Sequence, residues 1–413
     1  MPSLRECPGQ RDPGVGSMHR RQRIPTTTTR DLTTVRPLAL SGPTARNDRR
    51  ATLEPIIVGL LGITHPHASA RVRALREIEG VEVVAAADDD PRLTYFTEKY
   101  GLEARTIDGV LQDERINAIM VHSKSRDMVP HALRALDAGK SVVVEKPGGG
   151  TAEDLLRLRQ AEAEAKPGQV VQVGYNVRLA QSVSRAKELI EQGLIGEVVT
   201  VSARGAALVG EHETQHLNQP ADMGGVLWIL GCHMLDSLVR MFGAPESVNA
   251  RVHKSPKLSG DASREDSAAV LLNYPDKSMT FSFDGHDHLE WFESSRISVY
   301  GTGGMIELGI LPQKLRVYVD EDRGGYPAGW TEWTQSHFTP PFARTEANKF
   351  SELPELENIS NFHPEMRGWV ESIRTGAPVV APVSDALTVA RIVDACYRSE
   401  KERGASVDVE AGA

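Results

Sequence analysis

The sequence predicts an α/β N-terminal domain built on a doubly wound parallel sheet, followed by an α+β C-terminal domain with a large, mostly antiparallel open sheet. Three observations predict this fold. The chain has 413 residues, which suggests two or three domains. Between residues 56 and 175, short apolar runs alternate with amphipathic stretches, as in βαβ units. Beyond residue 176, runs with a period of two favour antiparallel strands.

The N-terminal domain contains five predicted strands. They are the apolar runs at residues 56–61, 81–87, 118–122, 141–145 and 170–175. Amphipathic helices are predicted between these runs and after them, at residues 69–78, 92–100, 128–138 and 151–165. Thr151, with Asp154 three residues later, predicts a capping box for the last helix. Such alternation is typical of a doubly wound domain.

The C-terminal domain has a different pattern. A helix is predicted at residues 183–192, and strands are predicted at residues 198–204, 268–274, 279–284 and 296–300. A very apolar helix at residues 226–242 interrupts the strands, and an amphipathic helix at residues 384–403 closes the chain. We therefore expect one domain over residues 52–175 and a second over residues 176–413.

Residues 1–51 are predicted to be a disordered, basic N-terminal extension. The first 50 residues contain ten Arg, no Lys and four acidic residues. The pair Arg20 and Arg21 is not followed by the apolar run of a twin-arginine signal. A start codon assigned too early, with Met18 as the internal candidate, is the alternative explanation.

The composition excludes several classes of protein. A net charge of −9 argues against nucleic-acid binding, which usually needs a clustered basic face. No run of about 18 apolar residues is present, so no membrane-spanning helix is expected. The three cysteines, Cys7, Cys232 and Cys396, form neither a disulfide framework nor a CxxC motif. These observations predict a cytoplasmic protein in a reducing compartment.

The first strand leads into a turn that resembles a phosphate-binding loop. Glycine is needed in such a loop because a side chain would keep the backbone away from a pyrophosphate at the helix N-terminus. Gly62 fits the GxGxxG pattern, but Thr64 stands at the second glycine position and His67 or Ala68 at the third. By itself the motif is equally compatible with a strand-to-helix turn that binds nothing.

The second strand ends at Asp88, 26 residues after Gly62. An acidic side chain at this point can accept hydrogen bonds from the adenosine ribose hydroxyls. Asp89 and Asp90 follow, and three carboxylates would repel a 2′-phosphate, so NAD is expected rather than NADP. A solvated acidic turn is the alternative interpretation.

The most specific signal is the run from Ala135 to Pro147, which reads ALDAGKSVVVEKP. Here the sequence resembles the glucose-fructose oxidoreductase, inositol dehydrogenase and rhizopine catabolism family (Gfo/Idh/MocA), whose members carry AL-x-x-GK-x-V-x-x-EKP. Further matching segments occur in the family's order: Arg178, residues 193–198 (GLIGEV), 224–225 (GG), 231–236 (GCHMLD) and 300–304 (YGTGG).

The resemblance implies a Rossmann domain and a C-terminal domain whose sheet mediates a homodimer or homotetramer. It implies oxidation or reduction of a sugar, inositol or similar polyol hydroxyl with NAD(P). Lys146 would lie beside the nicotinamide, lower the pKa of a substrate hydroxyl and stabilise the developing alkoxide. The expected cofactor-binding residues are Gly62, Thr64, His65, Asp88, Ser123, Glu145 and Lys146.

The resemblance places a proton-transferring histidine at His233, which we therefore expect to act as general base or acid. His233 belongs to a polar stripe on the apolar helix, with Asp236, Ser237 and Arg240 at helical spacing. A hydrogen-bonded core histidine is the alternative. The expected substrate-binding residues are Arg178, His216, Asp222 and Asp236.

The sequence departs from the family at three places. The usual Asp, four residues before the histidine, is Ile229, so Asp236, Asp222 or a substrate group would have to replace its carboxylate. The usual Thr-Pro and His after the third predicted strand are replaced by Ser123-Lys124 and Met128. The HPH sequence at residues 65–67 also predicts an unusual geometry on the nicotinamide side of the cofactor site.

Residues 212–216 match the HExxH motif of zinc hydrolases. Such a motif needs an apolar-faced helix, whereas Gly210 and Pro220 bracket a polar stretch here. Residues 286–288 (HDH) are most simply a solvated strand end, although they could join a metal cluster. We therefore assign no metal ligands from the sequence.

The leading hypothesis is an NAD-dependent oxidoreductase that acts on a carbohydrate or cyclic polyol. One variant would keep NAD bound and use transient oxidation to modify a glycoside. A second hypothesis is a non-catalytic sugar or nucleotide sensor, which Ile229 and the altered glycine loop would favour. A third is the metal-dependent hydrolase that the HExxH match suggests.

Overall fold

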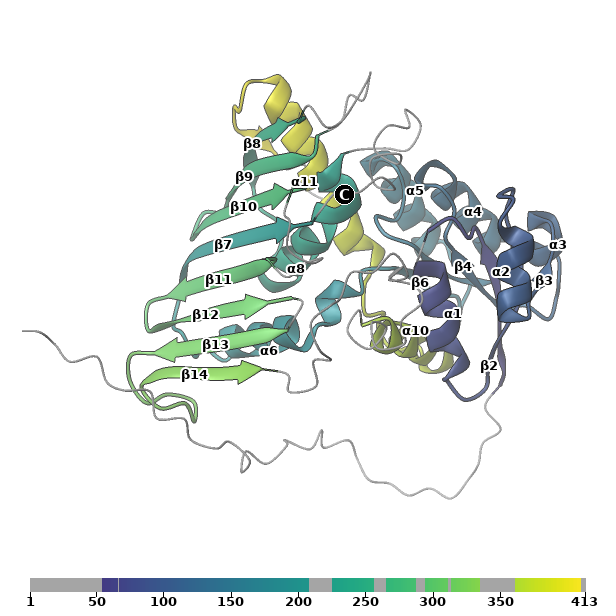
Figure 1. Ribbon diagram of the computed structural model, residues 1–413, viewed down its shortest axis with the longest axis horizontal. Helices are drawn as coiled ribbons and strands as arrows, with labels where there is room; N and C mark the ends of the chain where they lie inside the picture. The colour runs from purple at the N-terminus through teal and green to yellow at the C-terminus, as the bar shows by residue number, and fades with distance from the viewer. Residues whose placement is uncertain are drawn as a thin grey trace, which may run out of the picture. The chain divides into compact units, whose positions relative to one another are not determined.

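The computed structural model describes residues 54–65, 67–207, 225–255, 265–286, 294–310, 313–334 and 361–409. These residues form a six-stranded and a nine-stranded sheet, each packed against helices (Figure 1). Several sequence expectations lie outside the described residues: the N-terminal extension, the HExxH segment, His216, Asp222, and residues 287 and 288.

The six-stranded sheet is parallel, with the order β3-β2-β1-β4-β5-β6. Its strands are β1 (Ile56–Leu61), β2 (Val81–Ala87), β3 (Glu103–Ala104), β4 (Ala118–Val121), β5 (Ser141–Val144) and β6 (Val171–Val173). The strand order reverses between β1 and β4, and this switch point is where doubly wound sheets bind ligands. The predicted doubly wound fold is therefore confirmed, with β3 as an additional short strand.

The helices of this domain are α1 (His67–Arg76), α2 (Leu93–Tyr100), α3 (Ile107–Leu111), α4 (Ser125–Asp137) and α5 (Ala152–Ala163). The predicted cap of α5 is present, because the Thr151 hydroxyl oxygen accepts a hydrogen bond from the Asp154 N–H at 3.0 Å. Helix α3, only five residues long, was not predicted. It begins in the same way, with Thr106 as its cap.

The nine-stranded sheet has the order β14-β13-β12-β11-β7-β10-β9-β8-β15. Its strands are β7 (Val198–Ala206), β8 (Ser247–His253), β9 (Ser267–Asn273), β10 (Ser278–Asp284), β11 (Arg296–Gly301), β12 (Gly304–Gly309), β13 (Lys314–Val319), β14 (Gly329–Thr334) and β15 (Val407–Asp408). Among the strands that the described residues form in this sheet, only β7 and β10 pair in parallel. The mostly antiparallel sheet is confirmed, although β8 and β12 to β15 were not predicted.

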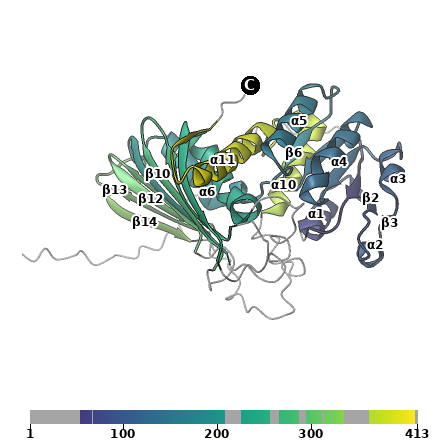
Figure 2. The same ribbon diagram turned by 90° about the horizontal axis from the view of Figure 1, so that it is seen from above.

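Helices α6 (Gln181–Glu191), α8 (Cys232–Phe242) and α11 (Val383–Lys401) lie along one face of this sheet (Figure 2). The predicted apolar helix begins with a π-helical turn, η2 (Leu227–Gly231), before it continues as α8. Helix α10 (Phe362–Thr375) was not predicted, and it packs against α1 of the first domain. Trp369 of α10 is fully buried in the same apolar cluster as Val58 and Leu60 of β1.

No helix in the described ranges is both long and apolar enough to cross a lipid bilayer.

Candidate functional site

The turn after β1 requires glycine at Gly62. This residue has φ +88°, and a Cβ atom there would collide with the backbone of Ser123 after β4. The Gly62 N–H donates to the Ala87 carbonyl oxygen at 2.8 Å, which ties the turn to the end of β2. The turn therefore lies at the carboxyl edge of the sheet, between β2 and β4, and leads into α1.

Asp88 lies directly beside this turn. Its Oδ2 accepts a hydrogen bond from the Ile63 N–H at 2.6 Å, and its Oδ1 accepts one from the Asp90 N–H at 2.9 Å. Partial burial raises the pKa of Asp88 despite these bonds. Asp90 is paired with Arg92, whose guanidinium donates to both carboxylate oxygens at 2.8 Å. The Asp88 carboxylate is thus held at a fixed place next to the phosphate-loop candidate.

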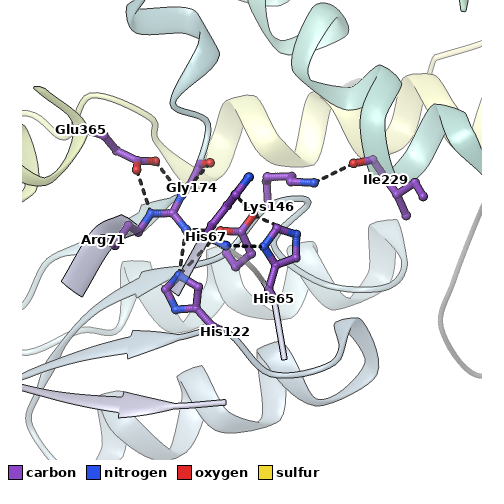
Figure 3. A network of polar contacts seen from close by, with 9 residues as sticks. His65, His67, Arg71, His122, Lys146, Gly174, Ile229 and Glu365 are labelled. Atoms are coloured by element: carbon purple, nitrogen blue, oxygen red, sulfur yellow. Dashed lines mark hydrogen bonds and ion pairs between the residues drawn. The ribbon is translucent and has the colours of Figure 1, made fainter. Parts of the chain in front are cut away.

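The side chains of Lys146 and His233 are both buried where the two domains meet. Lys146 follows β5, and its Nζ donates to the carbonyl oxygen of Ile229 in η2 at 2.7 Å (Figure 3). His233 lies in the first turn of α8, with the Tyr175 ring 6.0 Å away between centroids. Burial lowers the pKa of His233 well below its ordinary value, and the charge of Lys146 lowers it further. His233 is therefore neutral at pH 7.

Glu145, the residue before Lys146, is the centre of a buried polar cluster. Its Oε1 lies 3.0 Å from Nδ1 of His67 and 3.7 Å from Nε2 of His65. Its Oε2 forms an ion pair with Arg71 and lies 3.8 Å from Nε2 of His122. Burial alone would raise the pKa of Glu145, but the Arg71 charge and the neighbouring imidazoles outweigh it and hold this pKa well below its usual range.

Arg71 of α1 links the ends of three neighbouring strands. It contacts His122 after β4, Glu145 after β5, and the Gly174 carbonyl oxygen after β6, the last at 3.0 Å (Figure 3). It also donates from Nε and Nη2 to Glu365 of α10, at 2.8 and 2.9 Å. Arg71 is fully buried, and its pairing with two carboxylates offsets the cost of burying its charge.

The sequence did not predict that one cluster would contain Arg71, His67, His122 and Glu365. Parallel strands present their carboxyl ends at one edge, so His122 and Glu145 could have been grouped from the strand assignment. Glu365 could not, because it lies 294 residues from Arg71 in the sequence. Glu365 reaches Arg71 because α10 packs against α1 in the folded chain.

The expected substrate-binding residues Arg178 and Asp236 are joined in a separate buried ion pair. Arg178 donates to both Asp236 oxygens, at 2.8 and 2.5 Å, and to Asp385 at 2.9 Å. Burial raises the pKa of Asp236 to about 6, against the lowering effect of Arg178. These contacts occupy the guanidinium, so a structural role for this pair is at least as well supported as contact with substrate.

Two further expected residues lie near the β1 turn. The Ser123 hydroxyl is 2.6 Å from Nδ1 of His131 and donates to the Leu61 carbonyl oxygen at 3.2 Å. Thr64 lies in the turn between Gly62 and α1. Gly62, Asp88 and Ser123 therefore gather at one edge of the sheet, adjoining Glu145 and Lys146.

Comparison with known proteins identifies the family. Residues 54–175 match the GFO_IDH_MocA model described as an oxidoreductase family, NAD-binding Rossmann fold, and residues 187–409 match the model of its C-terminal alpha/beta domain. The chain is 24% identical over 358 residues to the uncharacterized oxidoreductase YdgJ of Escherichia coli, covering 84% of this chain and 97% of that protein. It is 25% identical over 300 residues to scyllo-inositol 2-dehydrogenase (NADP(+)) IolW of Bacillus subtilis, covering 72% of this chain and 80% of that protein.

Solved structures show the same fold. Levoglucosan dehydrogenase in complex with NADH and levoglucosan matches with a TM-score of 0.72 and 18% identity, over 87% of this chain and all of that chain. Aldose-aldose oxidoreductase from Caulobacter crescentus matches with a TM-score of 0.70 and 21% identity, over 86% of this chain and all of that one. With both family domains matched in order over most of its length, the chain belongs to the Gfo/Idh/MocA family of oxidoreductases.

Proposed function

We propose that the protein transfers a hydride between a hydroxyl-bearing carbon of a carbohydrate or cyclic polyol and the nicotinamide of NAD. The observation that carries the proposal is the burial of Lys146 and His233 together at the carboxyl edge of β5, adjoining the Gly62 turn. Relatives named inositol 2-dehydrogenase and scyllo-inositol 2-dehydrogenase support the substrate class. The structural neighbour named levoglucosan dehydrogenase agrees with a carbohydrate substrate.

The residues at this edge fit a dinucleotide. Gly62 provides a turn without a side chain before α1, and Asp88 presents a fixed carboxylate to a ribose. A bound nicotinamide cofactor would accept or supply the hydride. Lys146 would donate from Nζ to the reacting oxygen, exchanging its present bond to Ile229 for one to substrate. A ring nitrogen of His233 would take the hydroxyl proton in oxidation and return it in reduction.

We further propose a preference for NAD over NADP. Asp88, Asp89 and Asp90 follow β2, and a 2′-phosphate there would meet their negative charge. Arg92 is a nearby cation that could bind such a phosphate, but its guanidinium is already paired with Asp90. The name of the Bacillus subtilis relative includes NADP(+), so the proposed preference rests on the acidic residues of this chain and not on that relative.

The first experiment is a titration of the full chain with NADH and with NADPH, monitored by nicotinamide fluorescence. We expect tighter binding of NADH, and an Asp88→Ala variant that loses at least about tenfold in NADH affinity. A screen of sugars, inositols and glycosides with NAD would then identify the substrate by NADH formation. Folded, cofactor-free protein that binds neither dinucleotide would overturn the proposal.

A non-catalytic sensor is the second candidate, because Ile229 replaces the carboxylate that the family usually has near His233. A sensor would bind ligand and dinucleotide but release no NADH with any polyol. An enzyme that recycles tightly bound NAD would also release no net NADH, but it would convert a glycoside to product. Product analysis together with NADH release therefore separates the three functions.

We also propose that the nine-stranded sheet joins copies of the chain. The exposed large apolar residues of the described ranges lie mainly on this sheet: Val199, Leu271, Tyr300, Tyr318, Trp330 and Trp333. A shallow hollow of about 510 Å³ lies over β7 to β11. Apolar surface of this kind is typical of interfaces. Sedimentation analysis should show a homodimer or homotetramer, and a monomer at micromolar concentration would contradict the proposal.

A further inference from the structure

We propose that His65, His67 and Glu145 form a binding site for one divalent transition-metal ion of the Zn²⁺ class. This inference goes beyond the proposed function, because it does not depend on hydride transfer or on a particular substrate. It also differs from the sequence analysis, which assigned no metal ligands. The HExxH segment, whose sequence suggested a zinc site, lies outside the described residues.

The three side chains have the spacing of a metal ligand set. One nitrogen of each histidine and one oxygen of Glu145 all lie within 4.8 Å of one another. Oε1 of Glu145 is 3.0 Å from the His67 nitrogen and 3.7 Å from the His65 nitrogen. Ligand atoms bound at about 2.1 Å to a tetrahedral ion are about 3.4 Å apart. Small side-chain movements would therefore suffice to bind an ion.

The charges around the site also suit a metal ion. The buried ion pair with Arg71 holds Glu145 as a carboxylate, and a metal ion binds an imidazole through a ring nitrogen that carries no proton. The site presents two imidazoles and one carboxylate, a set that favours Zn²⁺, Co²⁺ or Fe²⁺ over Mg²⁺ or Ca²⁺.

A second layer of contacts orients the carboxylate. Oε2 of Glu145 is held by Arg71, which is in turn held by Glu365 of α10. This arrangement leaves Oε1 facing the two histidines. Metal sites commonly fix their carboxylate ligands by such outer contacts. The ion would thus bind to a preformed oxygen at the junction of the two domains.

Ion binding requires a change of tautomer at both histidines. Nδ1 of His67 now donates to the Glu145 oxygen, so this proton must move to Nε2 if Nδ1 is to bind the ion. In His65 the situation is reversed: its Nδ1 accepts the backbone N–H of His67 at 3.3 Å, so in the metal-free state its proton is on Nε2, facing Glu145. To bind through Nε2, the ring must move this proton to Nδ1 and lose a long, weak hydrogen bond. His65 retains 19% of its side-chain exposure, which gives an ion a route to the site. Three protein ligands leave at least one coordination position open.

The test is titration of the EDTA-treated full chain with Co²⁺, by calorimetry and by visible absorption of the bound ion. We expect one equivalent to bind, and His65→Ala and His67→Ala each to weaken binding at least about tenfold. His363→Ala is the matched control, because His363 lies on α10 and contacts Glu77 rather than Glu145. It should bind Co²⁺ as the unaltered chain does.

Two results would overturn the proposal: no stoichiometric binding, or unchanged Co²⁺ affinity in both His65→Ala and His67→Ala. In the second case His216→Ala would remove binding if the HExxH segment holds the ion. Thermal melting verifies that each variant is folded, and His65→Gln provides a second substitution at the partly exposed position. NADH titration of the metal-free chain separates failure of this site from failure of the proposed function.

Discussion

Nζ of Lys146 donates a hydrogen bond to the carbonyl oxygen of Ile229 at 2.7 Å, and so connects the end of β5 to the π-helical turn η2. Ile229 stands where the family usually has Asp. Lys146 is therefore held by the backbone at this position rather than by a side-chain carboxylate. Single π-helical turns within α-helices are frequent at functional sites. Lys146 thus has a hydrogen-bond partner at residue 229 although the side chain there is apolar.

Because the contact uses the backbone, Ile229→Val should leave it in place. We expect kcat to stay within about twofold of the unaltered protein, and the free energy of unfolding to fall by about 1 kcal/mol, as for one lost methylene group in partly buried packing. Steady-state kinetics and urea unfolding measure the two quantities. A fall in kcat of a hundredfold would show that the side chain itself takes part in the reaction.

Lys146→Ala removes the ammonium group that we place on the reacting oxygen. Loss of one such electrostatic contact typically lowers kcat by about 10² to 10³. NADH affinity and the melting temperature should change much less, because the bond to Ile229 is a single contact. Lys187→Ala on α6, where the ammonium pairs with Glu191, is the control. Turnover equal to that of the control would exclude Lys146 from the chemistry.

Gly62→Ala should both destabilise the fold and weaken dinucleotide binding. Residue 62 has a positive φ that alanine disfavours, and the new Cβ atom would collide with the backbone of Ser123. Gly139 is a matched control, since it has φ +80° but nothing within 4 Å of its Cβ position. Gly139→Ala should cost about 1 kcal/mol, and Gly62→Ala should cost at least about twice that. Equal losses in urea unfolding would mean that the turn relaxes without strain.

Removal of Arg71 should leave two buried carboxylates, Glu145 and Glu365, without their cation. Breaking a buried pair in this way costs about 3 to 5 kcal/mol, so Arg71→Met should lower the free energy of unfolding by that amount. Glu365→Gln should cost less, because it removes one charge and keeps a hydrogen-bonding group beside Arg71. Urea unfolding with a loss below about 1 kcal/mol for Arg71→Met would contradict this account.

The prediction from sequence was most accurate where local patterns decide the structure. Strands β1 and β2 have the predicted bounds, because each is an apolar run between turn residues. The π-helical form of η2 had no signal in the sequence, since a continuous apolar stretch shows no periodicity that distinguishes this form from an α-helix. Strands β12 to β14 were not predicted, although they are as long as β1; β12 and β14 contain Gly, which weakens the strand pattern, whereas β13 (KLRVYV) does alternate polar with apolar residues.

In the candidate site too, the residues of local motifs could be predicted and the contacts between distant segments could not. Lys146 and Glu145 followed from one continuous motif, whereas the Arg71–Glu365 pair depends on packing between segments 294 residues apart. No local pattern encodes such a contact. The roles of Arg178 and Asp236 were expected from the family resemblance and from the polar stripe of the apolar helix, whereas their mutual ion pair required the structure.

The buried histidines predict a loss of stability in mild acid. Burial, aided by the charge of Arg71, lowers the pKa of His122 to about 3 in the folded chain, against about 6.5 when unfolded. Between these values the unfolded chain binds a proton that the folded chain does not, so the free energy of unfolding falls as the pH falls. From pH 6.5 to 5 the contribution of His122 is about 2 kcal/mol.

His122→Gln should remove this contribution, because a glutamine oxygen can still accept the bond from Arg71 but does not titrate. The difference in free energy of unfolding between variant and unaltered chain should therefore shift by about 2 kcal/mol in favour of the variant between pH 6.5 and 5. Asp236, whose pKa burial raises to about 6, changes stability in the opposite direction over part of this range. Its effect is the same in both proteins and cancels in the difference. Urea unfolding of both proteins at the two pH values measures this difference. If the stability of the variant and of the unaltered chain changed equally with pH, His122 would bind protons as well in the folded chain as in the unfolded chain.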